Sequence, residues 1–86
     1  MTKELLLGIK SRLEDLYTGY YLALRTKREK NIRESRQAIS DYSQTIPTGV
    51  MNIFYREVGV NALNYQHADD ISECISILDK IIKTYD

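Results

Sequence analysis

The chain has 86 residues, with 12 basic and 12 acidic side chains, so its formal net charge is zero. This length suits one domain, residues 1–86, with little room for a deep active-site cleft. Zero net charge argues against a protein that holds nucleic acid by bulk charge, and the one cysteine, Cys74, excludes a scaffold held by internal disulfides. An apolar fraction of 43% excludes a disordered chain.

The N-terminal segment contains a short apolar run, Leu5–Ile9, between Glu4 and Lys10. A signal peptide needs about 7–15 apolar residues, and a membrane-spanning helix needs about 20. We therefore expect the chain to stay in the cytoplasm, where peripheral contact with the inner face of the membrane remains open.

The first predicted helix is marked by apolar residues at steps of three and four. Its stripe is Leu6, Ile9, Leu13, Leu16 or Tyr17, Tyr20 and Leu24. Thr2 is a candidate N-cap, and Glu4 in the first turn complements the helix dipole. Gly19 offers a break, but one glycine inside a helix costs only about 1 kcal/mol. The helix therefore ends between Thr18 and Lys27.

The second predicted helix has a narrow apolar seam. Its members are Ile32, Ser35, Ile39, Tyr42 and Ile46. Since few of them are large and apolar, we expect this helix to be half-buried. Pro47 ends it, because proline lacks an amide hydrogen and disfavours helical geometry in the preceding residue. Pro47 or Thr48 begins the next helix.

The third predicted helix is short, and the fourth has the clearest apolar stripe. The third contains Val50, Ile53, Phe54, Val58, Ala62 and Leu63. Gly59 interrupts it, and a compact connection over Asn64–His67 follows. The fourth contains Ile71, Cys74, Ile75, Leu78, Ile81, Ile82 and Tyr85. Asp69 and Asp70 are expected in its first turn, as the helix dipole favours.

No run of alternating residues is long enough to predict a strand. Short connections between amphipathic helices favour antiparallel neighbours. The sequence therefore predicts an all-α fold, a small antiparallel four-helix bundle. If the break near Gly19 is absent, we expect three long helices instead.

Groups for catalysis or metal binding are scarce. His67 is the only histidine, so neither a metal site nor a hydrolase has the converging groups that it needs. Cys74 lies on an apolar stripe and is expected to be a buried small hydrophobe. The adjacent pairs Glu14–Asp15 and Asp69–Asp70 point about 100° apart on a helix. We expect no enzyme, no catalytic residue, no cofactor and no metal.

The zero net charge conceals two oppositely charged regions. Residues 25–36 carry six basic and two acidic side chains, a net +4, and residues 69–86 carry two basic and five acidic ones, a net −3. The candidate basic patch is Arg25, Lys27, Arg28, Lys30, Arg33 and Arg36. It would suit anionic lipid headgroups or an acidic partner, and the alternative is a solvated face with intramolecular pairs. Nucleic acid is disfavoured, because the tyrosines are not interleaved with the arginines.

The seven tyrosines divide into two groups. Four fall on the predicted stripes and are expected in the core or at its edge: Tyr17, Tyr20, Tyr42 and Tyr85. The others fall off the stripes or in the connection: Tyr21, Tyr55 and Tyr65. Exposed tyrosines favour protein contacts, because they add contact area at little entropic cost.

Several features follow one another in a particular order along nearly the whole chain. They are Leu16–Tyr17 in the first helix, a second helix closed by a proline, the segment Ile46–Tyr55, a short third helix, a tight connection at Asn64–His67 and an apolar fourth helix. In this arrangement the sequence resembles the immunity proteins of pediocin-like (class IIa) bacteriocins, of the enterocin A immunity type.

The resemblance implies a cytoplasmic antiparallel four-helix bundle that protects a bacteriocin producer from its own toxin without being an enzyme. It implies recognition, from inside the cell, of the membrane mannose phosphotransferase permease with bound bacteriocin. Specificity in that family lies in the C-terminal half, which corresponds here to the candidate recognition residues Asn61, Asn64, Tyr65, Gln66, His67 and Tyr85. Many members have a tail after the fourth helix, whereas this sequence ends at Asp86, so we expect the role of that tail to be absent or moved.

Two other classes remain open. One is a helical interaction or regulatory module of the phage or plasmid accessory type, which homodimerisation would favour, whereas we expect a monomer for an immunity protein. The other is a small nucleic-acid binder that uses residues 25–36, whose binding would fall steeply with salt.

Overall fold

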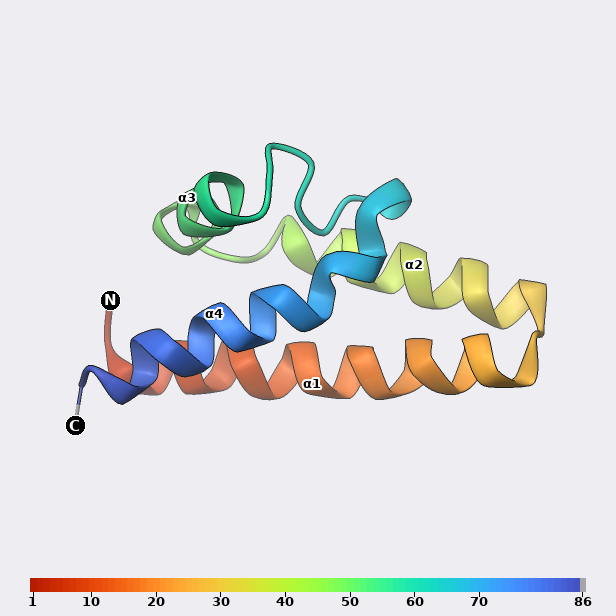
Figure 1. Ribbon diagram of the computed structural model, residues 1–86, viewed down its shortest axis with the longest axis horizontal. Coiled ribbons are helices and arrows are strands. Elements are labelled where there is room, and N and C mark those ends of the chain that lie inside the picture. Colours follow the sequence, from red (N-terminus) through yellow and green to blue (C-terminus); the bar gives the residue numbers. More distant parts are fainter. Residues whose placement is uncertain (86) are drawn as a thin grey trace.

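The computed structural model describes residues 1–85 and confirms the all-α class. Its four α-helices are α1 (Lys3–Thr26), α2 (Glu29–Ser43), α3 (Thr48–Glu57) and α4 (Ile71–Lys83), and a 3-10 segment, η1 (Tyr65–Asp70), leads into α4. In Figure 1, α2 returns beside α1 in the opposite direction, and α4 lies along the N-terminal half of α1. Helix α3 is seen nearly end-on, so it crosses the other three.

Helix α1 passes through Gly19 without a break. A side chain at Gly19 would meet nothing within 4 Å, so no neighbouring element forces a bend there. Thr2 caps the helix as predicted, since its hydroxyl oxygen accepts the Leu5 amide hydrogen at 3.1 Å. The helix ends where Lys27 takes a left-handed conformation, with φ 57°.

The expectation of three long helices in the absence of a break is wrong. Helix α1 is unbroken at Gly19, but the left-handed Lys27 and the extended Arg28 separate it from α2, so four helices remain. Helix α2 ends at Ser43, and Pro47 is the N-cap of α3, so these two helices are separate as well. The amide hydrogens of Val50 and Met51 bond to the Pro47 carbonyl, both at 3.0 Å, and start the new helix. The proline therefore acts as predicted, both as a stop and as a start.

Helix α3 is shorter than its predicted stripe. It ends at Glu57, because Gly59 has φ 147°, which does not continue a helix, so the predicted interruption at Gly59 is confirmed. Leu63, in the turn that follows, has φ 64°. Leu63 is still fully buried, but it reaches the core from a turn. The predicted compact connection at Asn64–His67 is thus too short. The chain between α3 and α4, residues 58–70, includes all of η1, and we call it the α3–α4 connection.

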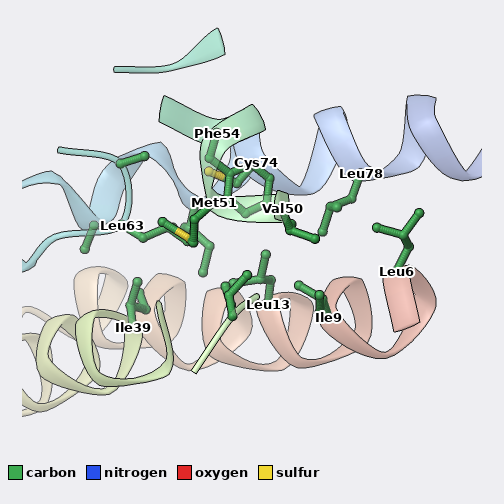
Figure 2. Packing of buried hydrophobic residues seen from close by; sticks show 14 of the residues in the cluster. Leu6, Ile9, Leu13, Ile39, Val50, Met51, Phe54, Leu63, Cys74 and Leu78 are labelled. Carbon is green, nitrogen blue, oxygen red and sulfur yellow. The ribbon is translucent and has the colours of Figure 1, made fainter. Parts of the chain in front are cut away.

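The core is one continuous apolar cluster to which every helix contributes (Figure 2). Val50, Met51 and Phe54 of α3 point into the space between α1 and α4. Helix α3 therefore joins the core through large side chains, although its axis crosses the others. Helix α2 supplies one fully buried apolar side chain, Ile39, which agrees with its prediction as a half-buried helix.

One member of the predicted α1 stripe, Leu24, lies outside this core, since it is 40% exposed, whereas Ala23, off the stripe, is buried. Of the two alternatives Leu16 and Tyr17, it is Leu16 that packs against the core, and Tyr17 is 38% exposed. The buried row of α1 thus continues to Ala23, and Tyr17 and Leu24 lie about 100° to one side of it.

The tyrosines predicted in the core or at its edge separate in the same way. Tyr20 is 2% exposed and Tyr42 is half-buried, as expected. The expectation is wrong for Tyr17, as above, and for Tyr85, which is exposed because it follows the end of α4.

Leu78 is fully buried on α4, so its truncation tests the core. We expect Leu78→Ala to lower the free energy of unfolding by about 2–5 kcal/mol, because it removes apolar contacts and leaves a cavity. Urea denaturation followed by circular dichroism measures the change. Leu7→Ala, on the exposed face of α1, is the control and should stay within about 0.5 kcal/mol. A loss below about 0.5 kcal/mol for Leu78→Ala would contradict the core assignment.

Candidate functional site

The candidate recognition residues lie in two separate places. Asn61, Asn64, Tyr65, Gln66 and His67 belong to the α3–α4 connection. Tyr85 follows α4, at the end of the molecule where both termini lie (Figure 1). Its hydroxyl group donates to the Met1 carbonyl at 3.3 Å. The structure therefore does not bring Tyr85 together with the other five.

A polar cluster ties the connection to the first two helices, and we call it the Tyr20 cluster. The Tyr20 hydroxyl donates to Asp69 of η1. The Arg36 guanidinium of α2 lies over the Tyr20 ring, 5.3 Å from its centroid, and donates to the Tyr65 carbonyl at 3.0 Å. The same guanidinium is 3.5 Å from the Asp69 carboxylate. Helices α1 and α2 and segment η1 thus meet at one tyrosine ring.

Burial, together with the hydrogen bond to Asp69, raises the pKa of Tyr20 to about 12. The phenol therefore remains a protonated donor at neutral pH. Asp69 and Asp70 were expected in the first turn of α4, and that placement is wrong, because both belong to η1. Because Asp69 lies in η1 and not in α4, its carboxylate reaches the Tyr20 hydroxyl group.

The second carboxylate holds the other part of the connection. Asp70 accepts the Leu63 amide hydrogen at 3.1 Å, at the point where Leu63 has its left-handed φ. A left-handed conformation is uncommon for a residue with a side chain as large as leucine. Burial raises the pKa of Asp70, and the bond from Leu63 opposes that rise. The two adjacent carboxylates thus fix different segments of one connection.

The connection exposes side chains that both donate and accept hydrogen bonds: Asn61, Asn64, Gln66 and His67. Asn64 and Asn61 bond to each other through their amide groups at 3.3 Å. Tyr65 is half-buried, and its carbonyl is held by Arg36. The arrangement is a polar surface on a constrained backbone, which suits recognition by contact.

The candidate basic patch is divided in space. Arg36 turns inward to the Tyr20 cluster, and its side chain is only 22% exposed. Two exposed pairs form along α2, Lys30–Glu34 at 4.0 Å and Arg33–Glu29 at 3.9 Å. The remaining members are at the α1–α2 turn: Arg25, Lys27 and Arg28.

Arginines and tyrosines that are not interleaved in the sequence are paired in the fold. Arg12 lies over Tyr42, 5.9 Å from the ring centroid, and so joins α1 to α2. Arg25 lies over the Tyr21 ring, at 5.7 Å. Contacts of this kind add modest stability at exposed positions. No spacing within a single helix could indicate the pair between α1 and α2.

Cys74 is fully buried, and burial raises the pKa of its thiol to about 12. The thiol is therefore protonated at neutral pH, as expected for a small hydrophobe. Among residues 1–85, no three His, Cys, Asp or Glu side chains gather closely enough to hold a metal ion. Within the same residues, no helix has both the length and the apolar character to cross a membrane.

The bond between Tyr20 and Asp69 can be measured by a double-mutant cycle. We expect Tyr20→Phe to cost about 1 kcal/mol, because it removes one donor to a charged acceptor. Urea denaturation of Tyr20→Phe, Asp69→Ala and the double variant should give a coupling free energy of about 1 kcal/mol between the two changes. Tyr21→Phe, on an exposed neighbouring ring, is the control. Additive effects of Tyr20→Phe and Asp69→Ala would show that the bond contributes nothing to stability.

Alkaline pH should destabilise the fold in a predictable window. Thiol and phenol groups ordinarily have pKa values of 9.0 and 10.0, whereas burial raises the pKa of both Cys74 and Tyr20 to about 12. Between these values the unfolded chain has released protons that the folded chain keeps, so stability falls as pH rises. We expect a fall of about 4 kcal/mol from Cys74 and about 2 kcal/mol from Tyr20 between pH 9 and 12.

Urea denaturation at a series of pH values would measure this fall. Tyr20→Phe removes the phenol and should flatten the fall above pH 10, whereas the exposed Tyr21→Phe should leave it unchanged. A free energy of unfolding that stays constant to pH 12 would refute the raised pKa values of Cys74 and Tyr20.

No family model, curated protein or solved structure matches this chain. Its function is therefore inferred from its own residues and their arrangement.

Proposed function

We propose that the chain is an immunity protein of the class IIa bacteriocin type, an antiparallel helical bundle that protects the producing cell from the cytoplasmic side. It recognises the membrane mannose phosphotransferase permease with bound bacteriocin. It works by binding, without catalysis and without a cofactor or metal. The order of sequence features that resembles the immunity proteins, with Leu16–Tyr17, the proline after the second helix and the segment Ile46–Tyr55, motivates this proposal. The Tyr20 cluster supports recognition by contact, because it constrains a polar connection and leaves its side chains exposed.

A constrained backbone supports recognition because binding then costs less conformational entropy. The bonds from Arg36 to the Tyr65 carbonyl and from Leu63 to Asp70 fix the backbone on both sides of Asn64 and Gln66. Amide side chains discriminate between partners, because a mismatched partner leaves a buried polar group without a hydrogen bond. The connection therefore supplies specificity, while the helices supply a stable support.

A general helical interaction module is the second candidate, and the exposed tyrosines favour it. Tyr17, Tyr21 and Tyr55 are each at least 38% exposed, and such rings often anchor protein contacts. Light scattering after size-exclusion chromatography separates the two candidates. A stable homodimer favours the module, and a monomer favours the immunity protein.

Expression in a bacteriocin-sensitive strain tests the proposal directly. Challenged with a panel of class IIa bacteriocins, expressing cells should need at least about tenfold more of one toxin for growth inhibition, which corresponds to about 1.4 kcal/mol in a binding equilibrium. Gln66→Ala with His67→Ala should abolish most of this protection, because it removes exposed polar groups of the connection.

The matched control is Gln44→Ala with Asn52→Ala, which removes exposed polar groups elsewhere. Circular dichroism and urea midpoints establish that all variants fold. Unchanged killing by every toxin would refute the immunity function. Full protection by the Gln66→Ala/His67→Ala variant would refute the role of the connection.

A further inference from the structure

The α1–α2 turn forms one end of the elongated molecule, opposite the termini (Figure 1). Arg25, Lys27 and Arg28 are exposed at this end, and none forms an ion pair with a carboxylate among residues 1–85. Lys30 and Arg33 follow on α2 and are balanced by Glu29 and Glu34. The end of the molecule therefore has an uncompensated positive charge, although the whole chain is neutral.

The same end exposes large apolar and aromatic side chains. Leu22 is 53% exposed and Tyr21 is 46% exposed, and Leu24 and Tyr17 are nearly as open. The Tyr17 and Tyr21 rings lie 6.2 Å apart on one side of α1, and Arg25 lies over the second. In Figure 1, α4 lies beside the N-terminal half of α1 and does not reach this part of the helix.

We propose that this end, which we call the basic tip (Tyr21, Leu22, Leu24, Arg25, Lys27 and Arg28), docks on a membrane surface that contains anionic lipid. Tyrosine suits the boundary of a bilayer, because its ring is apolar and its hydroxyl group reaches the headgroups. Exposed leucines enter the apolar edge, and the three cations meet lipid phosphates. The long stems of Lys27 and Arg28 allow their charges to remain in the headgroup layer.

Two observations favour a lipid surface over an acidic protein. The cations lie on a turn between two helices at the end of the molecule, so they can face a broad surface together. Arg25 rests on an aromatic ring, and neither Lys27 nor Arg28 is held by a carboxylate in the described part of the chain, so their charges can follow mobile phosphates. Specific protein contacts more often use a well-packed, pre-arranged centre.

Docking of the basic tip on the membrane would place an immunity protein beside its membrane receptor, so its role in the cell rests on the proposed function. The experiment itself needs neither toxin nor permease, so the two proposals fail separately. Flotation measures binding of the full chain to vesicles of phosphatidylcholine with phosphatidylglycerol, and to vesicles of phosphatidylcholine alone. We expect binding to the anionic vesicles only, and we expect it to weaken as salt rises.

Neutralising the tip should weaken binding by about fivefold for each cation removed, and so by about a hundredfold for Arg25→Gln, Lys27→Gln and Arg28→Gln together. The matched control is Arg56→Gln, Lys80→Gln and Lys83→Gln, which removes the same charge from α3 and α4. It should change binding by less than about twofold, because binding is local to the tip. Tyr21→Ser with Leu24→Ser should also weaken binding, while the salt dependence persists.

Four results would overturn the proposal. They are absence of binding to anionic vesicles at low salt, equal binding to neutral vesicles, equal weakening by the control triple variant, and dimerisation that Tyr21→Ser with Leu24→Ser abolishes. Polyglutamate that binds as tightly as the vesicles, with the same loss in the tip variant, would instead identify an acidic polypeptide as the partner. Protection from bacteriocin without vesicle binding would refute membrane docking by the basic tip, and it would not refute the immunity function.

Discussion

The hydrogen bond from the Tyr20 hydroxyl to Asp69 is the contact on which the arrangement of the second half of the chain depends. It joins α1 to the segment that leads into α4, across 49 positions of sequence. Apolar packing is non-directional, so it holds helices together without choosing where a connection lies. The bonds of Tyr20 and Arg36 are directional and make that choice. The ring carbons of Tyr20 thus pack in the core, and its hydroxyl group bonds to the α3–α4 connection.

The features that the sequence predicts well are local ones. The stripes of α1, α2 and α4, the Thr2 cap and the stop at Pro47 each depend on neighbours within about one helical turn. The break at Gly59 is also local, and α3 ends before it, as predicted. The path of residues 60–63 is different, because the left-handed Leu63 bonds through its amide hydrogen to a carboxylate seven residues later.

The candidate site shows the same difference between local features, which the sequence predicts, and long-range contacts, which it does not. Asn61–His67 could be predicted as one group, because these residues are contiguous. The inward turn of Arg36 could not, since its partner Tyr65 is 29 residues away and its ring contact lies on another helix. The separation of Tyr85 depends on where α4 ends relative to α1, and apolar spacing contains no information about that overlap. Periodicity predicts that a face is apolar, but not what covers it.

The partial overlap of α4 with α1 also divides the molecule into a thick half and a thin half. In the thick half, side chains from α1, α3 and α4 share one core, whereas beyond η1 the pair α1 and α2 continues alone. Helix α2 contributes few large apolar side chains, so the thin half opens locally at lower free energy than the core does. Amide hydrogens near residues 24–31 therefore exchange without global unfolding. Substitutions at that end therefore cost the fold less than substitutions in the core do.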